Sequence, residues 1–136
     1  SSLDLSQVYL DWTRENFLLN GIDPTNHYFC KGDTFHWLRR FAKQNRRFDY
    51  IILDPPTFSR DDRGKIFRVE KNYGQLFELA SACLSPEGKI LACTNFRGIS
   101  VSEFMKQLKG AHLKVSPMPE DFTDTPYLKS VWATFR

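Results

Sequence analysis

The most restrictive feature of the chain is an almost continuously apolar segment that stops at two prolines. Residues 48–53 read Phe-Asp-Tyr-Ile-Ile-Leu, and Asp54-Pro55-Pro56 follows directly. Such a run is typical of a central parallel strand that is covered on both faces, because it leaves no solvent side for polar residues. Consecutive prolines do not continue a strand or a helix. The segment therefore predicts an α/β fold with this strand in the middle of a sheet.

Strand and helix signals alternate along the rest of the chain. Apolar residues recur at helical spacing after Ser6 and after Asp33 or Thr34, which are suitable helix caps. Helices are expected over residues 6–20, from 33 or 34 onward, over 73–84 and over 101–109; strands at residue 3, 27–30, 48–53, 89–94, 112–116 and 128–135; loops over 57–71 and 117–126. The alternation indicates a doubly wound α/β sheet, and the last two strands, with no helix between them, predict an antiparallel hairpin.

Composition excludes several classes of protein. The chain has 136 residues, of which 41% are hydrophobic, and this fits one domain over residues 1–136. Its formal net charge is only +3, so any surface that binds nucleic acid must be a local patch. No apolar run approaches the roughly 20 residues that cross a bilayer, and no leader is visible, so no membrane partner is expected. The three cysteines have neither zinc nor disulfide spacing. They indicate a reducing, cytoplasmic location and no metal site.

Acidic residues follow three of the expected strands, namely Asp4, Asp33 and Asp54. Ligands of open α/β sheets bind at the carboxyl ends of strands. One such aspartate usually caps the next helix, whereas three together fit a nucleoside site. Asp4 can accept hydrogen bonds from a ribose diol, and Asp33 from an adenine amino group. Phe35 or Ile22 can pack against the adenine face, and the other interpretation is that both belong to the core.

The most specific motif is Asp54-Pro55-Pro56-Thr57-Phe58. Two prolines fix the backbone and leave carbonyl groups free to accept hydrogen bonds. Phe58 offers an aromatic face on which a base can stack. The other interpretation is a rigid turn whose phenylalanine is part of the core.

Basic residues form two clusters, at 39–47 and at 60–71. Either cluster can simply be a solvated helix end or loop. The second follows the proline motif directly, so its side chains are placed to contact phosphates beside a splayed base. Candidate phosphate ligands are Arg60, Arg63 and Lys65.

At these residues the chain resembles the class I S-adenosylmethionine-dependent methyltransferases, and in particular those that act on large-subunit ribosomal RNA. The segments that carry the resemblance are residues 3–6, 9–12, 15–21, Gly32-Asp33, 48–59 and 94–98. The Asp-Pro-Pro-Thr-Phe-Ser form is similar to the guanine-N7 branch of bifunctional enzymes, and the cytosine-C5 branch shares the layout.

The resemblance implies a Rossmann-like sheet, S-adenosylmethionine as cofactor, and RNA, ribosomal RNA in particular, as substrate. It implies that Asp4 holds the cofactor ribose, that Asp33 holds the adenine, and that the Asp54 motif faces the methyl group and the target base. Leu5, Thr34 and Phe35 are the further residues expected to bind the cofactor. The family's first strand and glycine-rich loop are lacking here, and no G-x-G-x-x-G run occurs. We therefore expect an N-terminally truncated domain, impaired in cofactor binding by itself, whose unpaired strand edges favour self-association.

The choice of base depends on whether a cysteine is available as a nucleophile. The cytosine-C5 branch has its cysteine just after the strand that corresponds to residues 89–94, where this chain has Asn95. Cys93 falls inside the strand and is expected to be a buried, inert thiol. Guanine N7 attacks a methyl group with its own lone pair, so orientation by Asp54, Pro55, Pro56 and Phe58 suffices. Thr57 and Asn95 are expected to contact the substrate.

Several other functions remain open at this point. A cytosine-C5 methyltransferase, an enzyme with a small-molecule or protein acceptor, and a non-catalytic binding module all fit the fold. A dinucleotide-dependent oxidoreductase is disfavoured, because the Asp54 motif has no role in hydride transfer.

Overall fold

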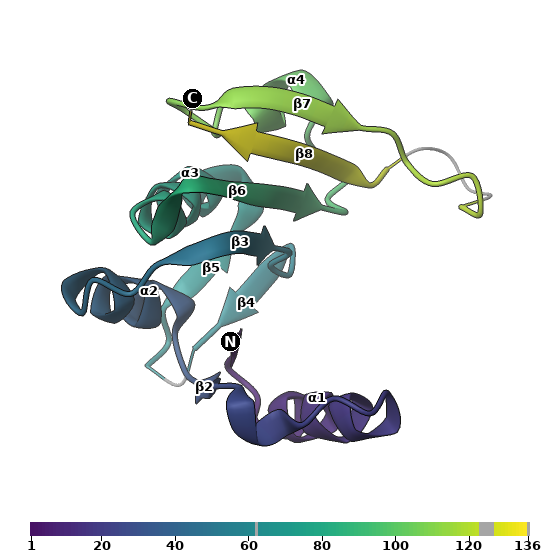
Figure 1. Ribbon diagram of the computed structural model, residues 1–136. Helices are drawn as coiled ribbons and strands as arrows, with labels where there is room; N and C mark the ends of the chain where they lie inside the picture. Colours follow the sequence, from purple (N-terminus) through teal and green to yellow (C-terminus); the bar gives the residue numbers. More distant parts are fainter. Residues whose placement is uncertain (62, 123–126, 136) are drawn as a thin grey trace.

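The computed structural model describes residues 1–61, 63–122 and 127–135 (Figure 1). The part of the expected loop 117–126 that covers residues 123–126 lies outside this range. In chain order the elements are β1 (Ser2–Asp4), α1 (Gln7–Leu19), a 3-10 turn (Pro24–Asn26), β2 (Phe29–Lys31), α2 (Thr34–Lys43), β3 (Phe48–Leu53), β4 (Phe58–Arg60), β5 (Ile66–Arg68), α3 (Val69–Ser81), β6 (Leu84–Thr94), α4 (Val101–Met105), β7 (His112–Ser116) and β8 (Lys129–Thr134).

The strands form a four-stranded sheet, a two-stranded sheet and a separate hairpin of β4 and β5. The larger sheet has the order β3-β6-β8-β7, and the smaller pairs β1 with β2 in parallel. β3 runs parallel to β6, whereas β8 runs antiparallel to both β6 and β7. Figure 1 shows the β1-β2 pair and α1 beyond β3, on the side away from β8 and β7. The α/β class and the C-terminal antiparallel hairpin are confirmed.

Helix boundaries follow the local signals that the sequence contains. The Ser6 hydroxyl caps α1 by accepting from the Tyr9 N–H, and the Asp33 carboxylate caps α2 by accepting from the Phe35 N–H. Ser100 and Glu103 form a reciprocal capping box on α4. This helix is shorter than predicted, because Gln107 and Leu108 donate to Phe104 and Met105, three residues back, and so tighten the last turn. No helix in the described part of the chain is long and apolar enough to span a membrane.

The prediction of a loop over residues 57–71 is wrong. β4 and β5 pair antiparallel, with Phe58 opposite Arg68 and Ser59 opposite Phe67. The Asp61 carboxylate closes their connection by accepting hydrogen bonds from the N–H groups of Arg63 (3.0 Å) and Lys65 (2.8 Å). α3 then begins at Val69, four residues earlier than expected.

Two predictions for β3 are also wrong: the strand lies at the edge of the large sheet and not in its middle, and it is not covered on both faces. On one face of β3 the Leu53 side chain is buried. Figure 1 shows α3 and α4 behind the strands of the large sheet. Tyr50 and Ile52 point to the opposite side and keep 68% and 69% of their surface exposed. Register places Ile52 beside Leu91, and Leu91 beside Trp132. The apolar run therefore reflects one buried face and one row of exposed apolar side chains.

Candidate functional site

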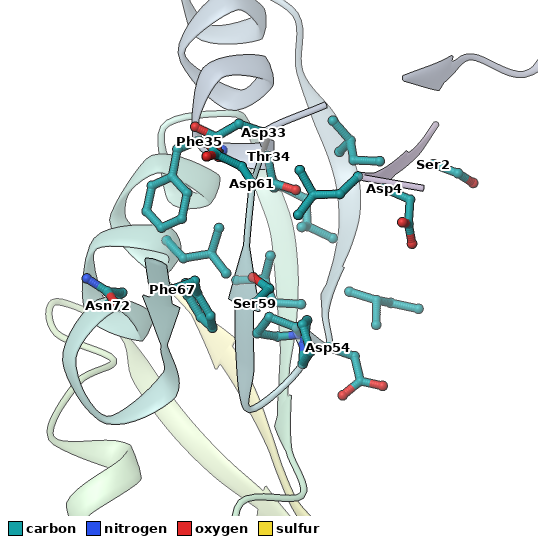
Figure 2. A pocket seen from close by; sticks show the side chains of 18 of the residues that line it. Ser2, Asp4, Asp33, Thr34, Phe35, Asp54, Ser59, Asp61, Phe67 and Asn72 are labelled. Atoms are coloured by element: carbon teal, nitrogen blue, oxygen red, sulfur yellow. The ribbon is translucent and has the colours of Figure 1, made fainter. Parts of the chain in front are cut away.

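A cleft of about 1000 Å³ separates β1 from β3 and brings the three strand-end aspartates together. Asp4 reaches it from β1, Asp33 from the end of β2 and Asp54 from the end of β3. Figure 2 shows the three side chains around this cleft, with Phe35 and Phe67 on its apolar wall. Leu5 and Thr34 line it as well. The chain thus gathers three carboxylates from segments that are distant in the sequence. Phe35 and Phe67 border the cleft but are only 6% and 9% exposed and belong to the core cluster, so the interpretation of Phe35 as a core residue is confirmed.

Asp4 and Asp33 both organise the backbone and face the cleft. The Asp4 carboxylate accepts from the Ser6 N–H at 2.7 Å, and Asp33 Oδ1 accepts from the Phe35 N–H at 3.0 Å. Between them, Gly32 has φ +127° and donates its N–H to the Asp4 carbonyl at 2.9 Å. This backbone conformation favours glycine. Gly32 therefore ties the end of β1 to the residue that precedes Asp33.

Lys65 occupies the remaining oxygen of Asp33. Its Nζ lies 3.2 Å from Asp33 Oδ2 and 4.4 Å from the centre of the Phe35 ring. The turn held by Asp61 places the lysine there, facing into the cleft. A ligand that uses Asp33 and Phe35 must share them with this ammonium group or displace it. Contact with an RNA phosphate, the role expected for Lys65, would draw its ammonium away from both partners.

The segments after β3 and β6 meet at the other end of the cleft. Asp54, Pro55, Pro56 and Asn95 line it, and the Thr57 hydroxyl donates to Asn95 Oδ1 at 3.2 Å. This hydrogen bond brings together two residues that the sequence associates with the substrate.

Tyr73, which the sequence does not single out, lies beneath this junction. Its hydroxyl lies 2.9 Å from the Leu53 carbonyl and 3.0 Å from the Cys93 carbonyl, so one buried O–H ties the last residue of β3 to the next-to-last residue of β6. Burial raises the pKa of this hydroxyl, which keeps its proton for donation. An apolar helix face containing a tyrosine gives no sequence signal for such a tie.

Phe58 does not line the cleft in the described structure. Its ring is 48% exposed, and the Arg68 guanidinium lies over it, 5.1 Å from the ring centre. Arg60 and Arg63 are exposed on the same hairpin. The structure thus separates two groups that the sequence places at one site: Lys65 faces the cleft, whereas Phe58 and the arginines do not line it.

The three cysteines are all buried. Burial raises the pKa of the thiols of Cys30, Cys83 and Cys93, and the Cys93 Sγ lies 3.6 Å from the Ser130 hydroxyl. Cys93 is 9% exposed and is not one of the described residues that line the cleft. A buried thiol with a raised pKa is a poor nucleophile.

Known proteins are similar to this chain in sequence, and solved structures are similar to it in the arrangement of elements. The ribosomal RNA large subunit methyltransferase K/L of Desulfotalea psychrophila is 34% identical over 134 residues, which are 97% of this chain and 18% of that protein. Methyltransferase K of Neisseria meningitidis, also named for large-subunit ribosomal RNA, is 32% identical over 123 residues, 89% of this chain and 35% of that one. No family model matches the chain.

Solved structures agree with these sequence relatives. SMU.776, crystallised in complex with SAH, has a TM-score of 0.86 at 28% identity over 98% of this chain and 38% of its own. The chain has the class I methyltransferase fold. A SAM-dependent methyltransferase from Agrobacterium tumefaciens shares this fold at 16% identity, with a TM-score of 0.77 over 96% of this chain and 46% of its own.

The methyltransferase fold extends over nearly all of the chain, and by sequence the chain resembles the large-subunit ribosomal RNA methyltransferases. It spans only about a fifth to a third of the length of these two relatives. The cleft between β1 and β3 lies at the strand ends where ligands of such sheets bind.

Proposed function

We propose that the full-length protein transfers a methyl group from S-adenosylmethionine to a base in ribosomal RNA, with guanine N7 as the favoured acceptor. The observation that carries the proposal is the meeting of Asp4, Asp33 and Asp54 at one cleft from three strand ends. The names of the relatives and the SAH in a similar structure support the same activity. A cytoplasmic location and a single domain over this part of the protein belong to the proposal.

The residues of the cleft fit the parts of the cofactor. All five of the residues expected at the cofactor, Asp4, Leu5, Asp33, Thr34 and Phe35, line the cleft, which supports this proposal. In it, Asp4 holds the ribose and Asp33 holds the adenine. The cofactor supplies a methyl group on a sulfonium, which a lone pair can attack. The chain's own contribution is orientation: the two prolines fix Asp54 at the end of β3, and Tyr73 and the Thr57–Asn95 hydrogen bond hold the neighbouring strand end beside it.

The surroundings of Cys93 favour guanine N7 over cytosine C5. Attack on cytosine C6 needs a thiolate that reaches the base, whereas burial raises the pKa of Cys93 and keeps it out of the cleft lining. Asn95 occupies the exposed position after β6 and contacts Thr57. Attack by guanine N7 needs no thiol and no general base.

The test is to measure methyl transfer by the full-length protein to ribosomal RNA and to identify the product nucleoside by mass spectrometry. We expect 7-methylguanosine. Asp54→Ala should lower the turnover by about a hundredfold or more, because displacing reacting atoms by about 1 Å has that effect. Cys93→Ser should keep most of the activity. A covalent adduct between Cys93 and RNA containing 5-fluorocytosine would refute the guanine assignment.

A non-catalytic binding module is the alternative to be excluded first. Lys65 already holds the Asp33 carboxylate and covers Phe35, as would suit a fold that binds no nucleoside. Isothermal titration of the full-length protein with S-adenosylmethionine separates the two functions. Binding by the parent protein that Asp33→Ala weakens supports the enzyme, and absence of binding by the parent supports the module.

A further inference from the structure

The hairpin formed by β4 and β5 has two different faces. Side chains alternate along its strands. Ser59 and Phe67, which pair across the hairpin, line the cleft. Phe58 and Arg68, the neighbouring pair, do not line it. In the third pair, next to the turn, Ile66 borders the cleft but Arg60 does not. We call the side that carries Phe58, Arg60 and Arg68 the outer face of the hairpin.

The outer face combines an exposed aromatic ring with two exposed cations. Phe58 is 48% exposed even though the Arg68 guanidinium lies over its ring, so part of the ring remains open to a ligand. Arg60 is exposed two residues along the same strand, roughly 7 Å away at strand spacing. An isolated exposed phenylalanine is ordinary, but this one lies beside two guanidinium groups, which are planar phosphate ligands and stacking partners.

We propose that the outer face binds single-stranded RNA next to the nucleotide that enters the cleft. A flanking base stacks on the open part of Phe58 or on the Arg68 guanidinium, and Arg60 and Arg68 contact the adjoining phosphates. Bases stack on aromatic rings whatever their identity, so this surface would position RNA without selecting a sequence. The inference rests on the proposed RNA methylation and gives Phe58 a role outside the reacting centre.

The outer face is only a few residues along the chain from the residues that line the cleft. Phe58 is four residues after Asp54, and the turn that Asp61 closes carries Lys65 back to Asp33. RNA bound along the outer face therefore lies close to the strand ends. Charge agrees with this choice of partner, because the exposed Arg60, Arg63 and Arg68 all belong to the hairpin or its turn.

The inference is tested by fluorescence anisotropy with the full-length protein and a short, labelled single-stranded RNA that has one central guanine. Phe58→Ala should weaken binding at least about fivefold at every salt concentration, as expected when one base no longer stacks. Arg60→Gln with Arg68→Gln should make the slope of log affinity against log salt shallower by about 1.4, which is about 0.7 for each phosphate that the variant no longer neutralises.

Arg39→Gln with Lys43→Gln is the matched control, since it removes two exposed charges from α2. If it changes the salt slope as much as the hairpin variant does, only the net charge matters and the inference fails. Phe58→Ala with unchanged RNA affinity but reduced turnover would place the ring at the reacting base and would also overturn it. If the hairpin variants unfold at a lower urea concentration but bind RNA as the parent does, the Phe58–Arg68 pair only stabilises the fold. That result would refute the inference.

Titration with S-adenosylmethionine keeps this result separate from the proposed function. The hairpin variants should bind the cofactor as the parent does, because none of the three residues lines the cleft. A parent that binds RNA through the outer face but no cofactor would retain the inference as a binding surface and refute the enzyme.

Discussion

The large sheet and the β1-β2 unit differ in how they are held, although both supply residues to the same cleft. Most of the buried core cluster comes from α2, α3, α4 and the large sheet, with Phe67 from the hairpin, and from residues 1–31 it includes only Cys30. α1 buries Leu10 but exposes Trp12 and Leu19. The large sheet therefore carries most of the packing, whereas the β1-β2 unit carries Asp4 and Asp33. Under the proposed function, most of the stability and two of the three cleft aspartates therefore come from different parts of the molecule.

The largest expected difference between the two regions is in the loss of stability when one aromatic residue of each is replaced by alanine. Phe77 in α3 is 1% exposed and stacks on Phe135, so Phe77→Ala should lower the free energy of unfolding by about 3–5 kcal/mol. Trp12 in α1 is 60% exposed, and Trp12→Ala should cost less than about 1 kcal/mol. Urea denaturation of both variants measures the difference. Equal losses of stability would show that α1 is packed as firmly as α3.

The exposed row on the large sheet should make this 136-residue chain self-associate at high concentration. Ile52 is 69% exposed beside Leu91, and burying such a side chain is worth about 1.5–3 kcal/mol. Ile52→Lys should therefore weaken association by roughly tenfold or more in sedimentation equilibrium. Val101→Lys, which changes an exposed apolar residue on α4, is the control. A monomeric parent at all concentrations contradicts the prediction.

Replacing Asp33 in the full-length protein tests whether the β1-β2 unit binds the cofactor. Asp33→Ala should weaken binding of S-adenosylmethionine by about 1–3 kcal/mol, because a buried donor is left without its acceptor. It also removes the α2 cap. Asp33→Asn keeps a good cap and replaces one acceptor by an amide N–H₂, so it isolates recognition from helix stability. Calorimetric titration of both variants measures the effect, and unchanged affinity in both would remove Asp33 from the site.

Replacing Lys65 should change cofactor affinity least, and should strengthen binding where Asp33→Ala weakens it. If its ammonium competes with the cofactor for Asp33 and Phe35, Lys65→Met should tighten cofactor binding by no more than about 1 kcal/mol, the usual size of a partly exposed ion pair. The same titration measures it. Arg63→Met, at the exposed turn of the same hairpin, should leave the affinity unchanged. Weaker binding in Lys65→Met would mean that the lysine assists the cofactor.

Local signals in the sequence predict most of the fold. Ser6 and Asp33 cap the helices that they precede, and β7 matches its predicted bounds, because caps and apolar runs act within a few residues. They also predict that three aspartates lie at strand ends, which the structure brings to one cleft. What the sequence does not contain is the identity of distant neighbours, so the exposed face of β3 could not be predicted from its apolar composition.

The errors at the candidate site have the same physical cause. Phe58 and Arg68 pair across a hairpin of two three-residue strands, which is too short to give a period. Lys65 and Asp33 are 32 positions apart and meet only because the hairpin folds back over α2. Tyr73 contacts two carbonyl groups, each 20 positions away. Each of these interactions depends on tertiary packing rather than on the residue types nearby.

The burial of all three thiols has a practical consequence for following this protein in solution. Alkylating reagents attack the thiolate, and burial raises the pKa of Cys30, Cys83 and Cys93. A cysteine introduced at the exposed Arg63 position should therefore react with a maleimide dye well before the native thiols do. A single fluorophore at the hairpin turn would then report the approach of RNA in a protein that keeps its own cysteines.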